Sequence, residues 1–152
     1  MSGGRRFDPQ HAARSVARKL AAQALYRWQL NESPWQDLAQ EFDQEPDMAK
    51  ADRSYFLGLI EDIARERQAL DDLLAGWQDR SAAALDPVEH AILWIGVTEL
   101  RSRPETPWRV AISEAVALAR RFGATDGHKF VNAVLDHAAH ALRGTEIAGA
   151  DG

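Results

Sequence analysis

The stretch LDPVEHAILWIGVTEL, Leu85 to Leu100, decides the fold class. Asp86 followed by Pro87 is a helix start, an N-cap carboxylate and then a proline at the first helical position. The apolar residues that follow occupy more than one face of the helix, a pattern typical of a helix at the centre of a bundle. Gly96 within it costs about 1 kcal/mol relative to alanine, unless a neighbouring helix approaches closely there.

Helical patterns continue on both sides of this segment. They predict helices that start at Asp8-Pro9, at Ser33-Pro34, near Asp52, at Thr106-Pro107 and after ATDG, residues 124–127. No convincing strand alternation occurs. The sequence therefore predicts an all-α protein of about seven helices.

Local composition predicts the domain organisation. A loose segment around residues 76–84 divides one helical domain, residues 9–143, into an N-terminal subdomain (about 9–78) and a C-terminal subdomain (about 79–143). Both halves carry apolar stripes, so they are expected to pack together and share a core. Residues 1–8 are predicted to form a flexible basic arm, and residues 144–152 a disordered tail.

Composition excludes several classes of function. The 152 residues contain no cysteine, which excludes disulfides, thiolate metal sites and a cysteine nucleophile. No segment approaches the roughly 20 apolar residues of a membrane span, and the first ten residues lack the apolar core of a signal peptide. The sequence predicts a cytoplasmic protein that does not associate with membranes.

Charge is unevenly distributed along the chain. The net charge of −5 argues against bulk electrostatic coating of nucleic acid. Residues 5–19 are nevertheless basic, whereas residues 28–49 contain acidic residues but no Lys or Arg. A basic patch on an acidic body and two ordinary solvated helix faces both fit this pattern.

Neither a metal site nor catalysis is predicted. His128 and His137 are nine residues apart and face opposite sides of a helix, and no HExxH pattern is present. Asp126, His128 and Glu114 could meet at one end of the bundle for acid–base chemistry, but no nucleophile or oxyanion site accompanies them. Asp126 is instead expected to cap a helix. We therefore predict that the protein is not an enzyme and uses no cofactor.

Binding of single-stranded nucleic acid is the remaining hypothesis from the residues. His11, Arg14 and Arg18 fall on one face of the first helix, and Tyr26 extends that surface. Basic groups position phosphates and an aromatic ring stacks on an unpaired base. The start of the last helix, with Lys129, offers free N–H groups to an anion. Trp28 is expected in the core, whereas both core packing and an exposed role suit Tyr26.

Four motifs, in order, make the sequence similar to a known family. AAQALYRWQL, LDPVEHAILWIGVTEL, PWRVAISEAVALARRFG and ATDGHKFVNAVLD together resemble the NusB family of bacterial transcription antitermination factors, from about Ala13 to Leu142. The resemblance implies a two-subdomain helical protein that binds boxA RNA of ribosomal RNA leaders together with NusE, a small-subunit ribosomal protein. That pair joins an RNA polymerase complex that resists termination, and no reaction is catalysed.

The resemblance also assigns residues to these roles. It implies RNA contacts by Arg14, Arg18, Tyr26, Asp126, His128 and Lys129. It implies contacts with NusE by Glu89, Trp108 and Arg109.

One departure from the family pattern bears on RNA binding. Three consecutive arginines are replaced here by Arg14-Ser15-Val16, so RNA affinity of the isolated protein is expected to be low unless Arg5 and Arg6 compensate. The alternative function is a protein-only adaptor or homodimer with weak or lost RNA binding.

Overall fold

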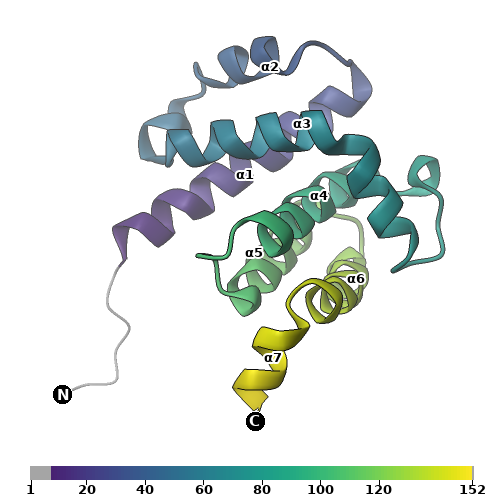
Figure 1. The fold of residues 1–152 in the computed structure, drawn as a ribbon. Coiled ribbons are helices and arrows are strands. Elements are labelled where there is room, and N and C mark those ends of the chain that lie inside the picture. The colour runs from purple at the N-terminus through teal and green to yellow at the C-terminus, as the bar shows by residue number, and fades with distance from the viewer. Residues whose placement is uncertain (1–7, 152) are drawn as a thin grey trace.

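The computed structural model describes residues 8–151, and within that range it contains helices and no β-strand (Figure 1). Seven α-helices and two 3₁₀ helices follow in the order α1 (Pro9–Leu30), α2 (Trp35–Phe42), η1 (Pro46–Lys50), α3 (Arg53–Ala75), η2 (Ala82–Ala84), α4 (Pro87–Ser102), α5 (Trp108–Phe122), α6 (Gly127–Leu142) and α7 (Gly144–Asp151). The predicted all-α fold class is confirmed. Most of the predicted arm, residues 1–7, lies outside the described residues.

The Asp-Pro starts of α1 and α4 are confirmed. The Asp86 carboxylate accepts hydrogen bonds from the backbone N–H groups of Val88 and Glu89, at 2.9 and 3.1 Å. Asp8 caps α1 in the same way, through the second and third residues of that helix. Each carboxylate satisfies donors that have no partner within the helix, so both helices begin at a defined residue.

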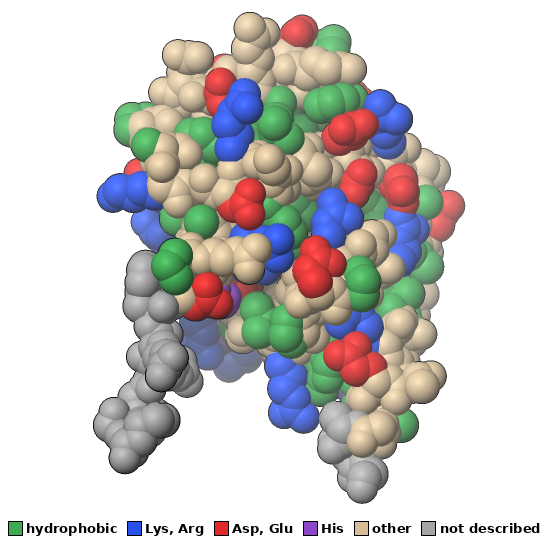
Figure 2. Space-filling view, turned by 60° about the vertical axis from the view of Figure 1, so that its left-hand side comes forward, with side chains coloured by type: hydrophobic (Ala, Val, Ile, Leu, Met, Phe, Trp, Pro, Cys, Tyr) green, Lys and Arg blue, Asp and Glu red, His purple; other side chains and the backbone are tan. Residues whose placement is uncertain are grey.

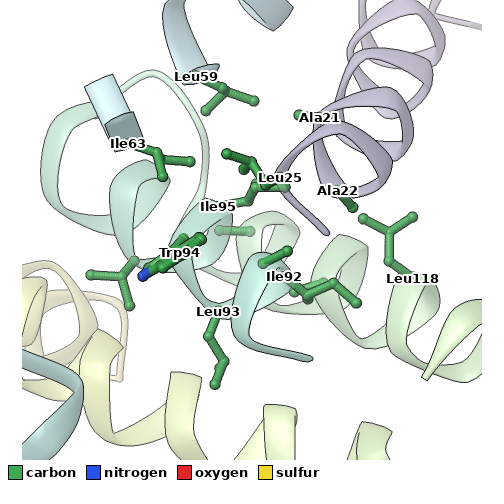
Figure 3. Packing of buried hydrophobic residues seen from close by; sticks show 14 of the residues in the cluster. Ala21, Ala22, Leu25, Leu59, Ile63, Ile92, Leu93, Trp94, Ile95 and Leu118 are labelled. Atoms are coloured by element: carbon green, nitrogen blue, oxygen red, sulfur yellow. The ribbon is translucent and has the colours of Figure 1, made fainter. Parts of the chain in front are cut away.

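Helix α4 lies at the centre of the molecule, between α1 and α3 on one side and α5 and α6 on the other (Figure 1). Every residue from Glu89 to Leu100 is buried. Figure 3 shows why this helix needs apolar side chains all around: Ile92, Leu93, Trp94 and Ile95 point in different directions. The central position predicted from residues 85–100 is confirmed.

Gly96 permits the closest packing on α4. A Cβ atom at this position would lie 2.7 and 2.9 Å from the two Cδ atoms of Leu135 in α6. Because real side chains do not approach this closely, α6 packs here against bare α4 backbone. The helix-propensity cost of Gly96 is thus offset by interhelical packing, as expected where a neighbouring helix approaches closely.

The two halves of the chain share one core. Its cluster of buried apolar side chains includes residues from all seven α-helices. Trp28 of α1 packs edge-on against Trp94 of α4, with ring centroids 6.1 Å apart. Because both halves bury their apolar faces on α4, neither half keeps a separate core. The subdomain limits near residues 78 and 79 stay a prediction.

Helix α7 corrects the expectation of a disordered tail. Ile147 is only 5% exposed and joins the core. Arg143, the C-cap of α6, donates to four backbone carbonyls at the end of α4 and in the turn after it, those of Glu99, Leu100, Arg103 and Thr106. It also pairs with Glu146 at 3.1 Å. One apolar residue and one arginine order this segment, and neither forms the apolar repeat by which a sequence predicts a helix.

Candidate nucleic-acid interface

Arg18, predicted to contact RNA, is a core residue. Its side chain is 3% exposed, and its Nε and Nη2 atoms each lie 2.9 Å from Oε2 of Glu99, itself 1% exposed. Its Nη1 lies 3.1 Å from Oε1 of Glu114. Burial raises the pKa of Glu99, and burial together with the Glu99 charge raises the pKa of Tyr55 to about 12. The helix face that carries Arg18 packs against α3, α4 and α5, so this guanidinium is withheld from the surface.

Arg14 and His11 lie on the same helix face, and both also contact acidic or aromatic side chains of the protein. Arg14 Nε lies 3.3 Å from Oδ2 of Asp52, and the guanidinium carbon lies 4.5 Å from the centre of the Tyr55 ring. His11 remains half exposed, with Nε2 3.9 Å from Oε2 of Glu114. The predicted row of basic residues therefore exists as a helix face, but internal partners take much of its charge.

Tyr26 points outward, whereas Trp28 is buried as predicted. Tyr26 is 38% exposed and lines a hollow of about 760 Å³, which we call the Tyr26 groove. The groove lies among α1, the α2–η1 segment, the start of α4 and the end of α5. Its other lining residues are Leu20, Ala22, Gln23, Arg27, Leu30, Phe42, Glu45, Pro46, Asp47, Val88 and Phe122. Phe42 and Phe122 are further aromatic side chains in this lining; Phe42 is buried, whereas Phe122 is half-buried and packs against the core.

Beside this groove lies a group of cations that sequence analysis did not single out as a site. Lys19 forms an ion pair with Asp47, which lines the Tyr26 groove. Hydrogen bonding and charge from Lys19, with further charge from Lys50 and Arg121, lower the pKa of Asp47. Lys19 and Arg121 also line a smaller hollow of about 250 Å³ between α1 and α5. We call Lys19, Lys50 and Arg121 the cation cluster.

On the face in Figure 2, Lys and Arg side chains are interspersed with Asp and Glu. The view shows no broad patch of a single charge. Basic side chains on this face thus stand singly or in small groups among acids, in line with a net charge of −5.

The start of α6 forms an exposed corner, made of Asp126, His128 and Lys129. Asp126 has φ 64° and ψ 4°, and it is the one non-glycine residue with positive φ in residues 8–151. Its carboxylate makes no capping hydrogen bond, which corrects the predicted cap, and lies instead 3.3 Å from Nζ of Lys129. His128 is half-buried, while Asp126 and Lys129 are exposed.

Glu89, predicted to contact NusE, is buried behind this corner. It is 3% exposed, and Ala124 N–H donates to its Oε2 at 3.3 Å. Trp108 and Arg109, predicted to belong to the same contact surface, lie at the opposite end of α5, with the Arg109 guanidinium carbon 4.6 Å from the indole centre. Helix α5 is roughly 20 Å long, so the structure does not bring Glu89 together with the other two.

The Asp126, His128 and Glu114 constellation is not assembled. Glu114 pairs with Arg18 and Ser15 in the middle of the α1–α5 contact, two turns of α5 before the corner. Across the described residues, no group of three or more His, Asp or Glu side chains is arranged to hold a metal ion. None of the described helices is long and apolar enough to span a bilayer.

The fold and these surfaces together define a class: a small all-helical protein whose candidate site is an open, aromatic-lined surface beside cations. This chain belongs to the NusB family, because the model of that family matches residues 15–140. The resemblance inferred from the four motifs is confirmed.

Individual relatives agree with that assignment. Transcription antitermination protein NusB of Idiomarina loihiensis is 45% identical over 134 residues, which cover 88% of this chain and 96% of the relative. The protein of the same name from Hahella chejuensis is 45% identical over 137 residues, covering 90% and 92%. The chain therefore spans nearly the full length of these relatives.

Solved structures show the same fold at lower identity. The T. maritima NusB structure is 26% identical, with a TM-score of 0.73 over 82% of this chain and 89% of the other. A crystal structure of antitermination factors NusB and NusE in complex with dsRNA has a TM-score of 0.76 at 26% identity, covering 84% and 96%. That neighbour therefore contains both a protein partner and RNA.

Proposed function

We propose that this protein is a transcription antitermination factor that binds boxA RNA of ribosomal RNA leaders together with NusE. In this role it joins the RNA polymerase antitermination complex in the cytoplasm and catalyses no reaction. The observation that carries the proposal is the near full-length similarity to NusB proteins, one of which was solved with NusE and RNA. The Tyr26 groove and the cation cluster support it, because they supply the two kinds of contact that unpaired RNA needs.

In the proposed RNA surface, aromatic rings contact the bases and cations contact the phosphates. Tyr26 and Phe122 line one groove and offer ring faces to unpaired bases, a contact that tolerates different sequences. Lys19 and Arg121 lie beside the groove and attract phosphates, and Lys129 adds a charge at the exposed corner. Arg18 has a structural role here. Arg14 and Lys19 each contribute less than a free cation, because Asp52 and Asp47 already pair with them.

The test is a fluorescence titration of a single-stranded boxA RNA oligonucleotide, with and without NusE. Base stacking is worth about 1–3 kcal/mol per base, so Tyr26→Ala is expected to weaken binding roughly 5- to 150-fold. Tyr26→Phe keeps the ring and is expected to bind as the wild type does. Equal affinities for wild type and Tyr26→Ala, with and without NusE, would refute the stacking role.

The salt dependence of binding separates phosphate contacts from other effects. Arg121→Gln is expected to reduce the slope of log affinity against log salt by about 0.7, the value for one lost contact with a single strand. Lys19→Gln is expected to reduce it by less, because Asp47 already pairs with Lys19. Arg65→Gln is the matched control, because Arg65 is exposed on α3 and pairs with Glu61, away from the groove. A slope lowered equally by all three variants would indicate a general charge effect and no local site.

Trp108 and Arg109 are proposed as part of the NusE contact surface. An aromatic residue and an arginine side by side are the residue types most often found at energetic centres of interfaces. Trp108→Ala is expected to cost at least about 2 kcal/mol, or roughly 30-fold in NusE affinity, and to leave RNA binding without NusE unchanged. Unaltered NusE affinity would place the partner on another surface.

A specific observation favours the alternative function, a protein-only adaptor or homodimer. Arg14 and Arg18, the two basic residues that the family pattern assigns to RNA in the first helix, are both paired with acids inside the protein. The alternative predicts tight NusE binding or self-association with no measurable salt-dependent RNA binding. The titration above, run with analytical ultracentrifugation, decides between the two functions.

A further inference from the structure

Glu89 has no role at the surface, yet its carboxylate makes a specific contact. It belongs to the first turn of α4 and is 3% exposed. Ala124 N–H, in the α5–α6 loop, donates to its Oε2 at 3.3 Å. A buried carboxylate is costly unless it is hydrogen-bonded, and the donor that Glu89 has is a backbone N–H of this loop.

Gly127, the first residue of α6, is shaped by the same side chain. A Cβ atom on Gly127 would lie 2.8 Å from Cδ of Glu89 and closer still to its Oε2. Any larger residue at 127 would therefore displace either the carboxylate or the loop. Glu89 thus contacts both ends of the segment between Ala124 and Gly127.

Asp126 lies inside that segment and has a conformation that needs support. Its φ of 64° is in the left-handed region, which non-glycine residues adopt rarely and keep only where their surroundings hold it. Its side chain makes no capping hydrogen bond that would supply that support. The described neighbours that hold the segment are Ala124, through its bond to Glu89, and Gly127, through its close fit against Glu89.

We infer that Glu89 is a positioning residue for the corner formed by Asp126, His128 and Lys129. Its carboxylate holds the α5–α6 loop against α4, so that the left-handed Asp126 and the adjacent Lys129 face the RNA in one orientation. This inference rests on the proposed RNA-binding function, and it replaces the direct contact with NusE that the family resemblance implies for Glu89.

The charge environment of Glu89 provides a signal that is independent of RNA. Burial and the nearby Asp86 raise the pKa of the Glu89 carboxyl, while the Ala124 hydrogen bond and the Arg80 charge oppose that shift. In ¹⁵N-labelled protein, the Ala124 amide proton is expected to shift with pH as Glu89 titrates. In Glu89→Gln that titration is expected to disappear. If the Ala124 amide resonance of the wild type did not shift with pH, the hydrogen bond between Ala124 and Glu89 would be refuted.

RNA affinity tests the positioning role through paired variants. Glu89→Ala removes the acceptor and is expected to weaken boxA RNA binding on the order of tenfold in the presence of NusE. Glu89→Gln keeps an oxygen facing Ala124 and is expected to bind as the wild type does. Gly127→Ala is expected to resemble Glu89→Ala. The glycine control is Gly144→Ala, because a Cβ atom at Gly144 meets nothing within 4 Å.

A double-mutant cycle separates positioning from a general loss of structure. In the background Lys129→Ala, Glu89→Ala is expected to weaken RNA binding less than about twofold, because the corner has already lost its cation. An equal loss in both backgrounds would make Glu89 a stability residue and overturn the inference. So would a Glu89→Ala variant that loses NusE affinity but keeps RNA affinity. A wild-type chain that binds no RNA, with or without NusE, would overturn the proposed function and this inference with it.

Discussion

Replacing Arg18 with alanine is expected to lower the free energy of unfolding by about 3–5 kcal/mol, because it leaves a buried carboxylate without its cation. Arg18 and Glu99 are 3% and 1% exposed, and two guanidinium nitrogens each lie 2.9 Å from one carboxylate oxygen. After the change, the Tyr55 hydroxyl is the remaining donor to Glu99 among the described residues. For a chain of this size, the thermal midpoint should fall by roughly 6–20 °C.

The pH dependence of this loss has a defined sign. Burial already raises the pKa of Glu99 above its ordinary value of 4.5, so the folded state binds more protons than the unfolded state above that pH. The stability that Glu99 contributes therefore falls as the pH rises from about 4.5 to the raised pKa of Glu99 in the folded state. Without Arg18 the carboxylate is harder to ionise, so its folded-state pKa rises further and this pH range widens. The cost of Arg18→Ala is thus smallest at acidic pH and grows toward neutral pH.

Urea denaturation followed by circular dichroism, at pH 5 and pH 7, measures both quantities. Arg14→Ala is the matched control: it removes a half-buried arginine from the same helix face and should cost at most about 1 kcal/mol from its ion pair. Adding Glu99→Gln to Arg18→Ala should recover part of the loss. A stable Arg18→Ala protein with weakened RNA binding and a lower salt slope would refute the structural role and restore Arg18 as an RNA contact.

Four further variants test the packing and the charges. Gly96→Ala is expected to destabilise by about 1–2 kcal/mol, since overpacking against Leu135 exceeds the gain in helix propensity. Gly58→Ala, where the nearest atom is an arginine nitrogen at 3.4 Å, should gain up to about 1 kcal/mol, and a gain at both sites would contradict the close approach of α6. Arg143→Lys should lower the free energy of unfolding by about 2–4 kcal/mol and speed amide hydrogen exchange in α7. A lysine ammonium cannot donate to all four backbone carbonyls that the planar guanidinium reaches. Burial acts to raise the pKa of Asp71, but hydrogen bonds and charge from its neighbours outweigh burial and lower that pKa below 3.8. The stability that Asp71 contributes is therefore present above pH 3.8 and is lost as the pH falls below it. In Asp71→Asn, the decrease in unfolding free energy at acidic pH should become smaller, which unfolding titrations at different pH values measure.

Much of the fold could be predicted because its signals are local. The Asp-Pro pairs at residues 8 and 86 cap helices with hydrogen bonds to the next two or three residues, so no distant partner is needed. The apolar residues on all sides of residues 85–100 place that helix at the centre for the same reason. The ordering of α7 was not predictable in this way, because Arg143 finds its acceptors about 40 residues earlier in the chain.

The candidate site was predicted less completely. Tyr26 and Lys129 are exposed, as expected for residues that meet a ligand. Phe122 packs against the core and also lines the Tyr26 groove at the end of α5, and helical spacing alone shows only the first of these two contacts. The left-handed conformation of Asp126 carries no mark in the sequence beyond its residue type, since Asp tolerates that region better than most side chains.

The sequence by itself determined the helices, the central position of residues 85–100 and the family to which the chain belongs, because capping and apolar spacing act over a few residues. Only the tertiary structure decided how the charges are paired. Arg18 and Lys19 are neighbours on one helix, yet Arg18 is buried against Glu99, 81 residues away, while Lys19 pairs with Asp47 at the edge of a surface hollow. Which acid pairs with a basic residue, and whether the pair is buried or lies at the surface, depends on contacts between segments far apart in the chain.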